Sequence, residues 1–227
     1  MSAPSGKARA VLLDLDGTLL DTAPDMATAL NRLLAEQDQP PLPFAAIRPQ
    51  VSHGSNAVVR AGFPAADSEH FERLRARFLE LYSACLAEQT RPFPGFDAVL
   101  DELDARGIPW GIVTNKPAFL TLPLLAALQM QQRVGCVLSG DSLPERKPHP
   151  RPLLVAAQQL GIPPAQCLYL GDAERDITAA RAAGMIALGA GFGYLGTEDQ
   201  PQTWGAAAWL DSPAELLDWV GMRADRE

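Results

Sequence analysis

The sequence predicts an α/β fold, a doubly wound parallel sheet with an all-helical insertion after its first strand. The first observation is that short apolar runs alternate with segments of helical periodicity, as in the right-handed crossovers of such sheets. The second is that residues 23–90 show helical patterns and no convincing strand. The chain has 227 residues, of which 47% are hydrophobic and 20% are charged, so it can bury one core of ordinary size.

Five apolar runs rich in valine, isoleucine and leucine predict strands, and a sixth is expected near the end of the chain. None of the five alternates polar with apolar residues, which is typical of strands buried on both faces of a parallel sheet. The six predicted strands cover residues 10–15, 110–113, 134–138, 167–170, 185–188 and 207–210. The predicted helices of the core cover residues 96–106, 118–128, 152–160, 174–183 and 213–220.

The predicted insertion breaks the alternation of strand and helix. Its longest helix is expected at residues 71–86, where Phe71, Phe78 and Tyr82 recur at helical spacing. This spacing predicts that the three aromatic side chains form the core of the insertion. The predicted domains are an α/β core, residues 1–22 and 91–227, and a helical insertion, residues 23–90.

Composition and charge narrow the classes of partner. The chain has 19 Lys and Arg against 27 Asp and Glu, and this net charge of −8 argues against nonspecific nucleic-acid binding. Cys85, Cys136 and Cys167 are far apart and show no metal-binding or disulfide pattern. No segment approaches the roughly 20 apolar residues of a membrane span. We expect a cytoplasmic protein, monomer or homodimer, that binds a small molecule and neither nucleic acid nor membrane.

Carboxylates directly follow the first predicted strand. Asp14 and Asp16 lie two residues apart, so they would share a face in an extended chain, and Gly17 permits a turn after them. Ligands of open parallel sheets bind beyond the carboxyl ends of the strands. A turn at this position could bring the backbone and both carboxylates around a hard cation.

Other strand ends carry polar residues as well. Thr114 and Asn115 follow the second core strand, Lys147 lies in a proline-rich loop, and Asp172 and Asp176 follow a later strand. Taken singly, each has an ordinary structural explanation as a helix cap or an exposed charge. Taken together at successive strand ends, they favour one site that combines carboxylates, a hydroxyl and a cation.

Four segments in this order resemble the motifs of the haloacid dehalogenase superfamily of phosphotransferases. They are DLDGTLLDT at residues 14–22, VTNKP at 113–117, KPHP at 147–150 and GDAERD at 171–176. The resemblance covers nearly the whole chain and implies a Rossmann-like core. Residues 23–90 fall where that superfamily inserts its mobile helical cap.

The resemblance implies a covalent mechanism that suits the residue types. Asp14 would be the nucleophile that forms an aspartyl-phosphate, and Asp16 would protonate the leaving alkoxide and later deprotonate water. A carboxylate and a phosphate dianion repel each other, so a cation is needed, and Mg²⁺ prefers oxygen ligands. The implied ligands are the Asp14 side chain, the Asp16 backbone carbonyl and Asp172, with Asp176 orienting a metal-bound water.

The remaining motif residues would hold the phosphate. The resemblance implies that Thr114 and the Asn115 backbone bind phosphate oxygens, and that Lys147 offsets negative charge on the nucleophile and the phosphoryl group. Asp16 favours phosphate-ester chemistry, because dehalogenases and phosphonatases of the superfamily depart from the pattern there. A sugar phosphomutase shares these core residues, so it remains an alternative. A non-catalytic binding relative would be expected to have lost Asp14, Asp16 or Lys147, and all three are present.

Further segments resemble two groups of phosphatases within the superfamily. Residues 140–144 and 181–185 look like the phosphoglycolate phosphatase group. Residues 51–54, 110–111, 193–194, 198–199 and 204–206 resemble the N-acetylmuramic acid 6-phosphate phosphatases of peptidoglycan recycling. The resemblance implies a phosphoglycolate phosphatase-like enzyme, with the muramic phosphatase as the alternative. Because the core serves every substrate alike, selectivity is expected from cap residues, and His53 and Arg48 are the candidates.

Overall fold

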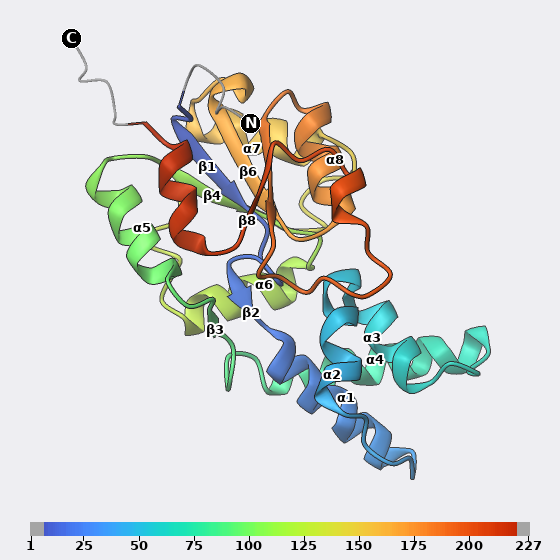
Figure 1. Ribbon diagram of the computed structural model, residues 1–227. Helices are drawn as coiled ribbons and strands as arrows, with labels where there is room; N and C mark the ends of the chain where they lie inside the picture. The colour runs from blue at the N-terminus through green and yellow to red at the C-terminus, as the bar shows by residue number, and fades with distance from the viewer. Residues whose placement is uncertain (1–6, 222–227) are drawn as a thin grey trace.

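The computed structural model describes residues 7–221, and a six-stranded parallel sheet forms the centre of the molecule (Figure 1). Its strands lie in the order β5-β4-β1-β6-β7-β8, and every neighbouring pair is parallel. The strands are β1 Ala10–Leu13, β4 Trp110–Val113, β5 Cys136–Leu138, β6 Cys167–Gly171, β7 Ile186–Ala190 and β8 Ala208–Leu210. The order reverses beside β1, which creates a crevice at the carboxyl ends of β1, β4 and β6.

Helices cover both faces of this sheet, which confirms the predicted doubly wound fold. The helices are α5 Phe96–Ala105, α6 Ala118–Ala127, α7 Arg151–Leu160 and α8 Glu174–Ala182. Side chains of β1 alternate between two apolar clusters. Val11 and Leu13 pack with residues of α5 and α6, and Ala10 and Leu12 pack with residues of α7 and α8. A strand buried on both faces therefore reads as an unbroken apolar run in the sequence.

The last predicted helix is present and is of the 3₁₀ type. It is η4, residues Pro213–Trp219. Two shorter 3₁₀ helices, η2 Pro164–Gln166 and η3 Pro201–Thr203, were not predicted. All three begin with proline, and 3₁₀ geometry is common in such short pieces, where few α-helical hydrogen bonds can form.

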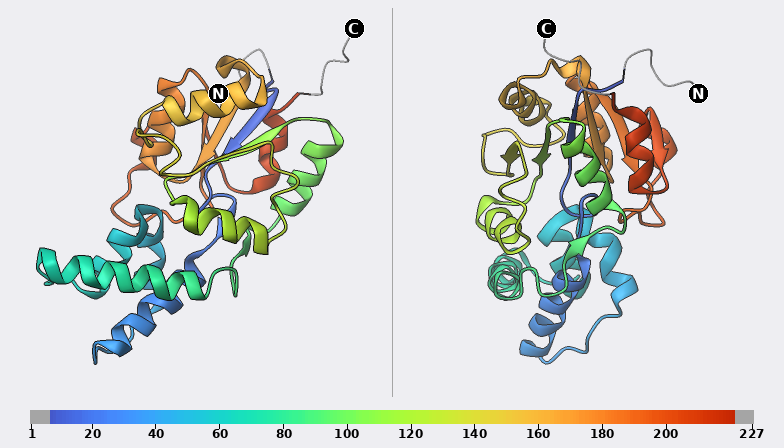
Figure 2. Two further views of the ribbon diagram at one scale, coloured as in Figure 1. Left: turned by 180° about the vertical axis from the view of Figure 1, so that it is seen from behind. Right: turned by 90° about the vertical axis from the view of Figure 1, so that its left-hand side faces the viewer.

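The structure describes every residue of 23–90, which we call the helical segment. This segment contains helices and no strand. Its elements are α1 Ala23–Glu36, α2 Phe44–Ile47, η1 Arg48–His53, α3 Gly54–Gly62 and α4 Ser68–Ala84. They pack on one another beyond the carboxyl end of the sheet (Figure 2). Helix α4 begins three residues before the predicted start, because the Asp67 side chain accepts a hydrogen bond from the His70 N–H at 2.9 Å.

The chain leaves and re-enters the core through a small antiparallel ladder that was not predicted. Strands β2 (Leu20–Asp21) and β3 (Arg91–Pro92) pair with each other at this point. Strands of two residues show no periodicity, so the sequence carried no signal for them. The ladder brings both links of the helical segment side by side.

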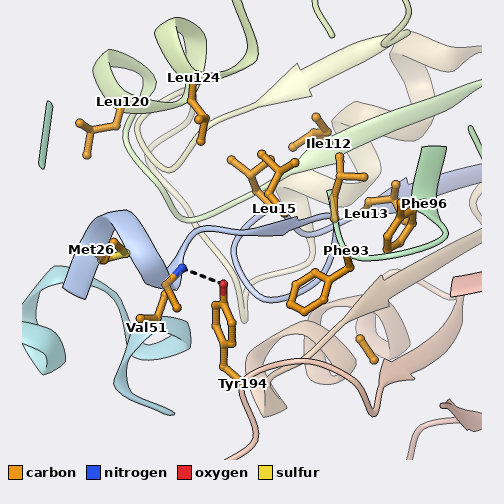
Figure 3. Close-up of a cluster of buried hydrophobic side chains, with 14 of the residues drawn as sticks. Leu13, Leu15, Met26, Val51, Phe93, Phe96, Ile112, Leu120, Leu124 and Tyr194 are labelled. Carbon is orange, nitrogen blue, oxygen red and sulfur yellow. Dashed lines mark hydrogen bonds between the residues drawn. The ribbon is translucent and has the colours of Figure 1, made fainter. Parts of the chain in front are cut away.

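Tyr194 joins the helical segment to the core (Figure 3). Its hydroxyl accepts a hydrogen bond from the Ala23 N–H at 2.9 Å and donates one to Asp21 Oδ1 at 2.7 Å. Its ring lies 5.9 Å from the ring of Phe93, and burial and the bond to Asp21 raise the pKa of its hydroxyl. The first turn of α1 is therefore fixed by a side chain that follows β7.

Two general properties concern membranes and cysteines. Within residues 7–221, no helix is long and apolar enough to cross a membrane. Cys85, Cys136 and Cys167 are buried free thiols. Burial raises the pKa of Cys136 to about 12 and that of Cys167 to about 11, so these thiols stay protonated near neutral pH.

Candidate active site

The predicted site residues of the core meet at the carboxyl ends of three adjacent strands. Asp14 follows β1, Thr114 follows β4 and Asp172 follows β6. A cavity of about 480 Å³ opens there, between the sheet and the helical segment. The core contributes Asp14, Asp16, Thr114, Asn115, Lys116 and Lys147 to its lining, and the helical segment contributes Ser52, His53, Asn56, Arg75, Phe78 and Tyr82.

A tight turn after β1 shapes the first part of the site. Gly17 has a φ of 84°, a left-handed conformation that disfavours side chains, and its N–H donates to Leu20 O at 3.0 Å. A Cβ atom at this position would also overlap the carboxylate of Asp172 and press on the ring of Tyr194. Glycine is therefore required both by the turn and by the close approach of Asp172.

Lys147 lies at the centre of the buried polar groups. Its Nζ lies 2.7 Å from each of three oxygens: Asp14 Oδ1, Asp176 Oδ1 and the Tyr169 hydroxyl. The Lys147 side chain is only 1% exposed, so these charge-assisted contacts are shielded from water. The Tyr169 hydroxyl donates in turn to Val113 O at 2.8 Å. Lys147 thus fixes one oxygen of Asp14 and leaves the other without this contact.

Asn115 holds the loop that carries Lys147. The Asn115 side chain donates from Nδ2 to Lys147 O at 2.9 Å, and its Oδ1 accepts from the Lys147 N–H at 3.1 Å. The loop is thereby tied to the end of β4. The neighbouring Thr114 is 4% exposed, and its hydroxyl accepts from the Lys116 N–H at 3.1 Å. Thr114 and Asn115 both line the cavity.

Three carboxylates form a buried acidic cluster. One oxygen each of Asp14, Asp172 and Asp176 can be chosen so that all lie within 4.8 Å of one another. Burial, reinforced by Asp14 and Asp176, raises the pKa of Asp172 to about 7, and burial and Asp176 raise the pKa of Asp14. Burial and mutual repulsion thus make these carboxylates harder to ionise, even with Lys147 and Arg175 nearby, and a bound cation would favour their charged forms.

The two carboxylate oxygens of Asp172 differ in their hydrogen bonding. Its Oδ2 accepts hydrogen bonds from the Ser52 hydroxyl and, at 3.0 Å, from the Tyr194 N–H. Its Oδ1 is buried without a hydrogen-bond partner among the residues that the structure describes. A buried oxygen without a partner is costly, and hard oxygen donors are the ligands that divalent cations such as Mg²⁺ prefer. The donor set therefore fits a divalent metal ion.

Asp16 lies outside this acidic cluster. Its Oδ1 accepts from the Thr22 hydroxyl at 2.7 Å and from Lys116 Nζ at 3.0 Å. Its carboxylate lines the cavity and is 17% exposed, in contrast to the carboxylate of Asp14, which is 3% exposed. The two carboxylates, two residues apart in the chain, thus face different partners.

Lys116 and Tyr82 are polar cavity residues whose contacts the sequence did not predict. Lys116 Nζ donates to the Tyr82 hydroxyl at 2.8 Å. Burial by itself would lower the pKa of Lys116, but Asp16 and Tyr82 raise it above its ordinary value, so the ammonium stays charged. Lys116 could have been noticed because it follows Thr114 and Asn115 at a strand end. Helical spacing alone could not distinguish Tyr82 from a residue that only fills the core of the helical segment.

The two candidates from the helical segment differ in their placement. His53, the last residue of η1, is exposed and lines the cavity. Arg48, the first residue of η1, is absent from the cavity lining; its guanidinium lies 4.8 Å from the ring centroid of Tyr194 and donates to Phe192 O at 3.5 Å. The structure therefore places His53 at the cavity and Arg48 at the junction with the core.

Comparison with known proteins finds, across most of the chain, the family that the four sequence motifs resemble. The model of the haloacid dehalogenase-like hydrolase family matches residues 11–190. The chain is 47% identical over 210 residues to a phosphoglycolate phosphatase of Xanthomonas campestris pv. campestris, covering 92% of this chain and 95% of that protein. It is 39% identical over 213 residues to an N-acetylmuramic acid 6-phosphate phosphatase of Pseudomonas aeruginosa, covering 93% and 94%.

A solved structure supports the fold. The crystal structure of a "predicted phosphoglycolate phosphatase" from Haemophilus somnus superposes with a TM-score of 0.83 at 27% sequence identity. The match covers 95% of this chain and 99% of that one. The similarity therefore extends over the sheet and the helical segment together.

Proposed function

The chain belongs to the haloacid dehalogenase-like hydrolase family, and on this premise we propose that it hydrolyses a small phosphate monoester through an aspartyl-phosphate on Asp14. The observation that carries the proposal is the buried contact of Lys147 Nζ with Asp14 Oδ1 at 2.7 Å, at the edge of a cavity. Lys147 orients the Asp14 carboxylate through Oδ1, and the other carboxylate oxygen of Asp14 attacks phosphorus. The relatives named as phosphatases support the same class, a phosphoric monoester hydrolase.

Asp16 supplies the proton transfers in this proposal. As the Asp14 oxygen bonds to phosphorus, the bond from phosphorus to the leaving oxygen breaks, and Asp16 gives that oxygen a proton. In the second step Asp16 takes a proton from water, the water oxygen bonds to phosphorus, and the bond to Asp14 breaks. Inorganic phosphate and the free carboxylate of Asp14 result. The separate contacts of Asp14 and Asp16 support this division of labour.

Mg²⁺ is the metal we propose for the acidic cluster. Asp14 and Asp172, together with the Asp16 backbone carbonyl, would hold it, and Asp176 would orient a bound water. Bound there, Mg²⁺ would offset the repulsion between the carboxylates and the phosphate dianion. The orphaned Asp172 Oδ1 and the raised pKa of Asp172, caused by burial and by Asp14, support this assignment.

Three groups of the core would bind the phosphate oxygens. They are the Thr114 hydroxyl, the Asn115 backbone N–H and the Lys147 ammonium. Together these groups would offset the negative charge that develops on the phosphate oxygens in the transition state. In the same proposal, residues 1–22 and 91–227 act as the catalytic core of a cytoplasmic enzyme, and residues 23–90 act as a cap that excludes water. The ladder of β2 and β3, where both links run side by side, supports that division.

Phosphoglycolate is the first candidate substrate, because relatives with that name share 44–47% identity with the chain. N-acetylmuramic acid 6-phosphate is the second, and the cavity favours it. A volume of about 480 Å³ exceeds what a two-carbon acid needs and suits a sugar. Both candidates carry a carboxylate besides the phosphate. Arg75 and Arg146 line the cavity and would attract such a group.

A kinetic panel tests the proposal. Phosphate release with Mg²⁺ would be measured for phosphoglycolate, N-acetylmuramic acid 6-phosphate, hexose phosphates and p-nitrophenyl phosphate. We expect release from p-nitrophenyl phosphate, and the highest kcat/KM for one of the two carboxylate-bearing substrates. Interconversion of hexose phosphates without phosphate release would instead indicate a mutase. No turnover of any substrate would indicate a binding protein.

A further inference from the structure

Lys116 is a buried cation that the proposed chemistry does not use. It follows the phosphate-binding residues Thr114 and Asn115, and its side chain is only 4% exposed. Its Nζ contacts two oxygens, Asp16 Oδ1 at 3.0 Å and the Tyr82 hydroxyl at 2.8 Å. One of these partners belongs to the core and the other to helix α4 of the helical segment. Lys116 therefore links the two sides of the cavity.

We infer that Lys116 is a positioning residue for the acid–base group Asp16, and that Tyr82 holds Lys116 in place from the helical segment. This inference rests on the proposed function, in which Asp16 protonates the leaving group. The position of the proton donor Asp16 then depends, through Lys116, on the Tyr82 side chain of the helical segment. Chemistry in the core and the packing of α4 are thereby coupled through one ammonium group.

The backbone of Lys116 is already fixed without Tyr82. Its N–H donates to the Thr114 hydroxyl at 3.1 Å, and its carbonyl accepts from the Gly140 N–H at 2.8 Å. Only the flexible stem and the ammonium remain to be placed. The Tyr82 hydroxyl accepts one N–H, and the ammonium lies 4.5 Å from the ring centroid of the same residue. Tyr82 thus binds the cation in two ways.

A second donor on Asp16 explains why Lys116 matters for orientation. The Thr22 hydroxyl donates to the same Oδ1 at 2.7 Å from the residue just before α1. With Thr22 alone, the carboxylate could rotate about this single hydrogen bond. With Lys116 as well, Oδ1 is held from two directions, so the second oxygen is left for the proton transfer.

The leaving-group dependence of kcat/KM tests the inference, because kcat/KM reports only the steps up to departure of the leaving group. Sugar and glycolate alkoxides need a proton, whereas p-nitrophenolate leaves without one. The ratio of kcat/KM for the better carboxylate-bearing substrate to that for p-nitrophenyl phosphate therefore measures how well Asp16 is placed. The variants are Lys116→Met, Lys116→Arg, Tyr82→Phe and the double variant Lys116→Met with Tyr82→Phe.

We expect Lys116→Met to lower this ratio by about tenfold and Tyr82→Phe by about threefold, less than the roughly 100-fold or more contributed by a proton-transfer group itself, because both variants keep Asp16. The double variant should match Lys116→Met alone, because Tyr82 acts through Lys116. Lys116→Arg, which keeps the charge, should recover part of the ratio. The matched control is Leu74→Ala, a buried position of α4 outside the cavity lining, which should leave the ratio unchanged.

Several outcomes would overturn the inference. One is an unchanged ratio in Lys116→Met and Tyr82→Phe when Asp16→Ala lowers it; the proposed function would then stand without the Lys116 link. Multiplicative losses in the double variant would show that Tyr82 acts independently of Lys116. If Lys116→Met fails to fold by circular dichroism, Tyr82→Phe against Leu74→Ala decides the matter. A wild-type protein without phosphatase activity would overturn the inference and the proposed function together.

Discussion

The rim of the sheet and the helical segment face each other across the cavity, but they hold their side chains in different ways. On the rim, Asp14, Lys147 and Asp172 are each about 2% exposed, and Lys147 contacts three oxygens at once. In the helical segment, Ser52 and Tyr82 are buried and bonded to the core, whereas His53 is exposed and Arg75 is half-buried. Preorganised groups suit a reaction that is the same for every substrate, and adjustable groups suit selection among substrates.

Loss of the proposed nucleophile, Asp14, gives the largest expected effect on activity. Asp14→Asn keeps the shape of the side chain but removes its charge, so turnover should fall by about 1,000-fold or more. The check is kcat with p-nitrophenyl phosphate and a circular dichroism spectrum that shows a retained fold. A variant that keeps more than a few per cent of activity would rule out covalent catalysis by Asp14. Beryllium fluoride or vanadate soaked into crystals should bind against this residue in the wild type.

Removal of the proposed metal ion should lower activity almost as strongly and leave the fold of the helical segment intact. Activity should vanish in EDTA and return with Mg²⁺, while Ca²⁺ should inhibit because its looser coordination disturbs the geometry. Asp172→Ala should raise the Mg²⁺ concentration needed for half-maximal activity by about tenfold or more. Titration of activity with Mg²⁺ measures this, and full activity in the chelator would contradict the metal assignment.

Asp16→Ala tests whether Asp16 transfers protons or only maintains the structure of the site. Its kcat/KM should fall by about 100-fold for a substrate with an alkoxide leaving group, and by much less for p-nitrophenyl phosphate. The reason is that p-nitrophenolate needs little protonation. Equal losses for both substrates would indicate that Asp16 only maintains the structure of the site. Thr22→Val, which removes one hydrogen-bond donor to Asp16, is the matched milder variant.

The smallest effects, and the sharpest comparison, come from two positions of the helical segment. His53→Ala should change the ratio of kcat/KM between phosphoglycolate and N-acetylmuramic acid 6-phosphate by about threefold to tenfold. Arg48→Ala should lower both values equally, because Arg48 packs on Tyr194 at the junction. Hydrolysis of p-nitrophenyl phosphate by His53→Ala should stay near the wild-type rate. A uniform loss in His53→Ala would mean that selectivity lies elsewhere, with Arg75 as the next position.

The sheet was predictable because each strand carries its own signal. A strand buried on both faces is an unbroken apolar run, as in Ala10–Leu13, and its end is marked by a polar residue such as Asp14. The boundaries were less predictable where they depend on contacts elsewhere. The strand expected at residues 134–138 begins at Cys136, and the ladder of β2 and β3 joins residues about 70 positions apart in the chain.

By itself, the sequence determined the fold class, the helical insertion and the set of polar residues at the strand ends. These follow from local patterns, since periodicity and spacing are properties of neighbouring residues. Only the tertiary structure decided which polar groups pair: Lys147 with Asp14 and Asp176, Asn115 with the loop of Lys147, and Tyr82 with Lys116. Such pairs depend on packing between distant elements, because a buried charge must find a partner wherever the fold places one.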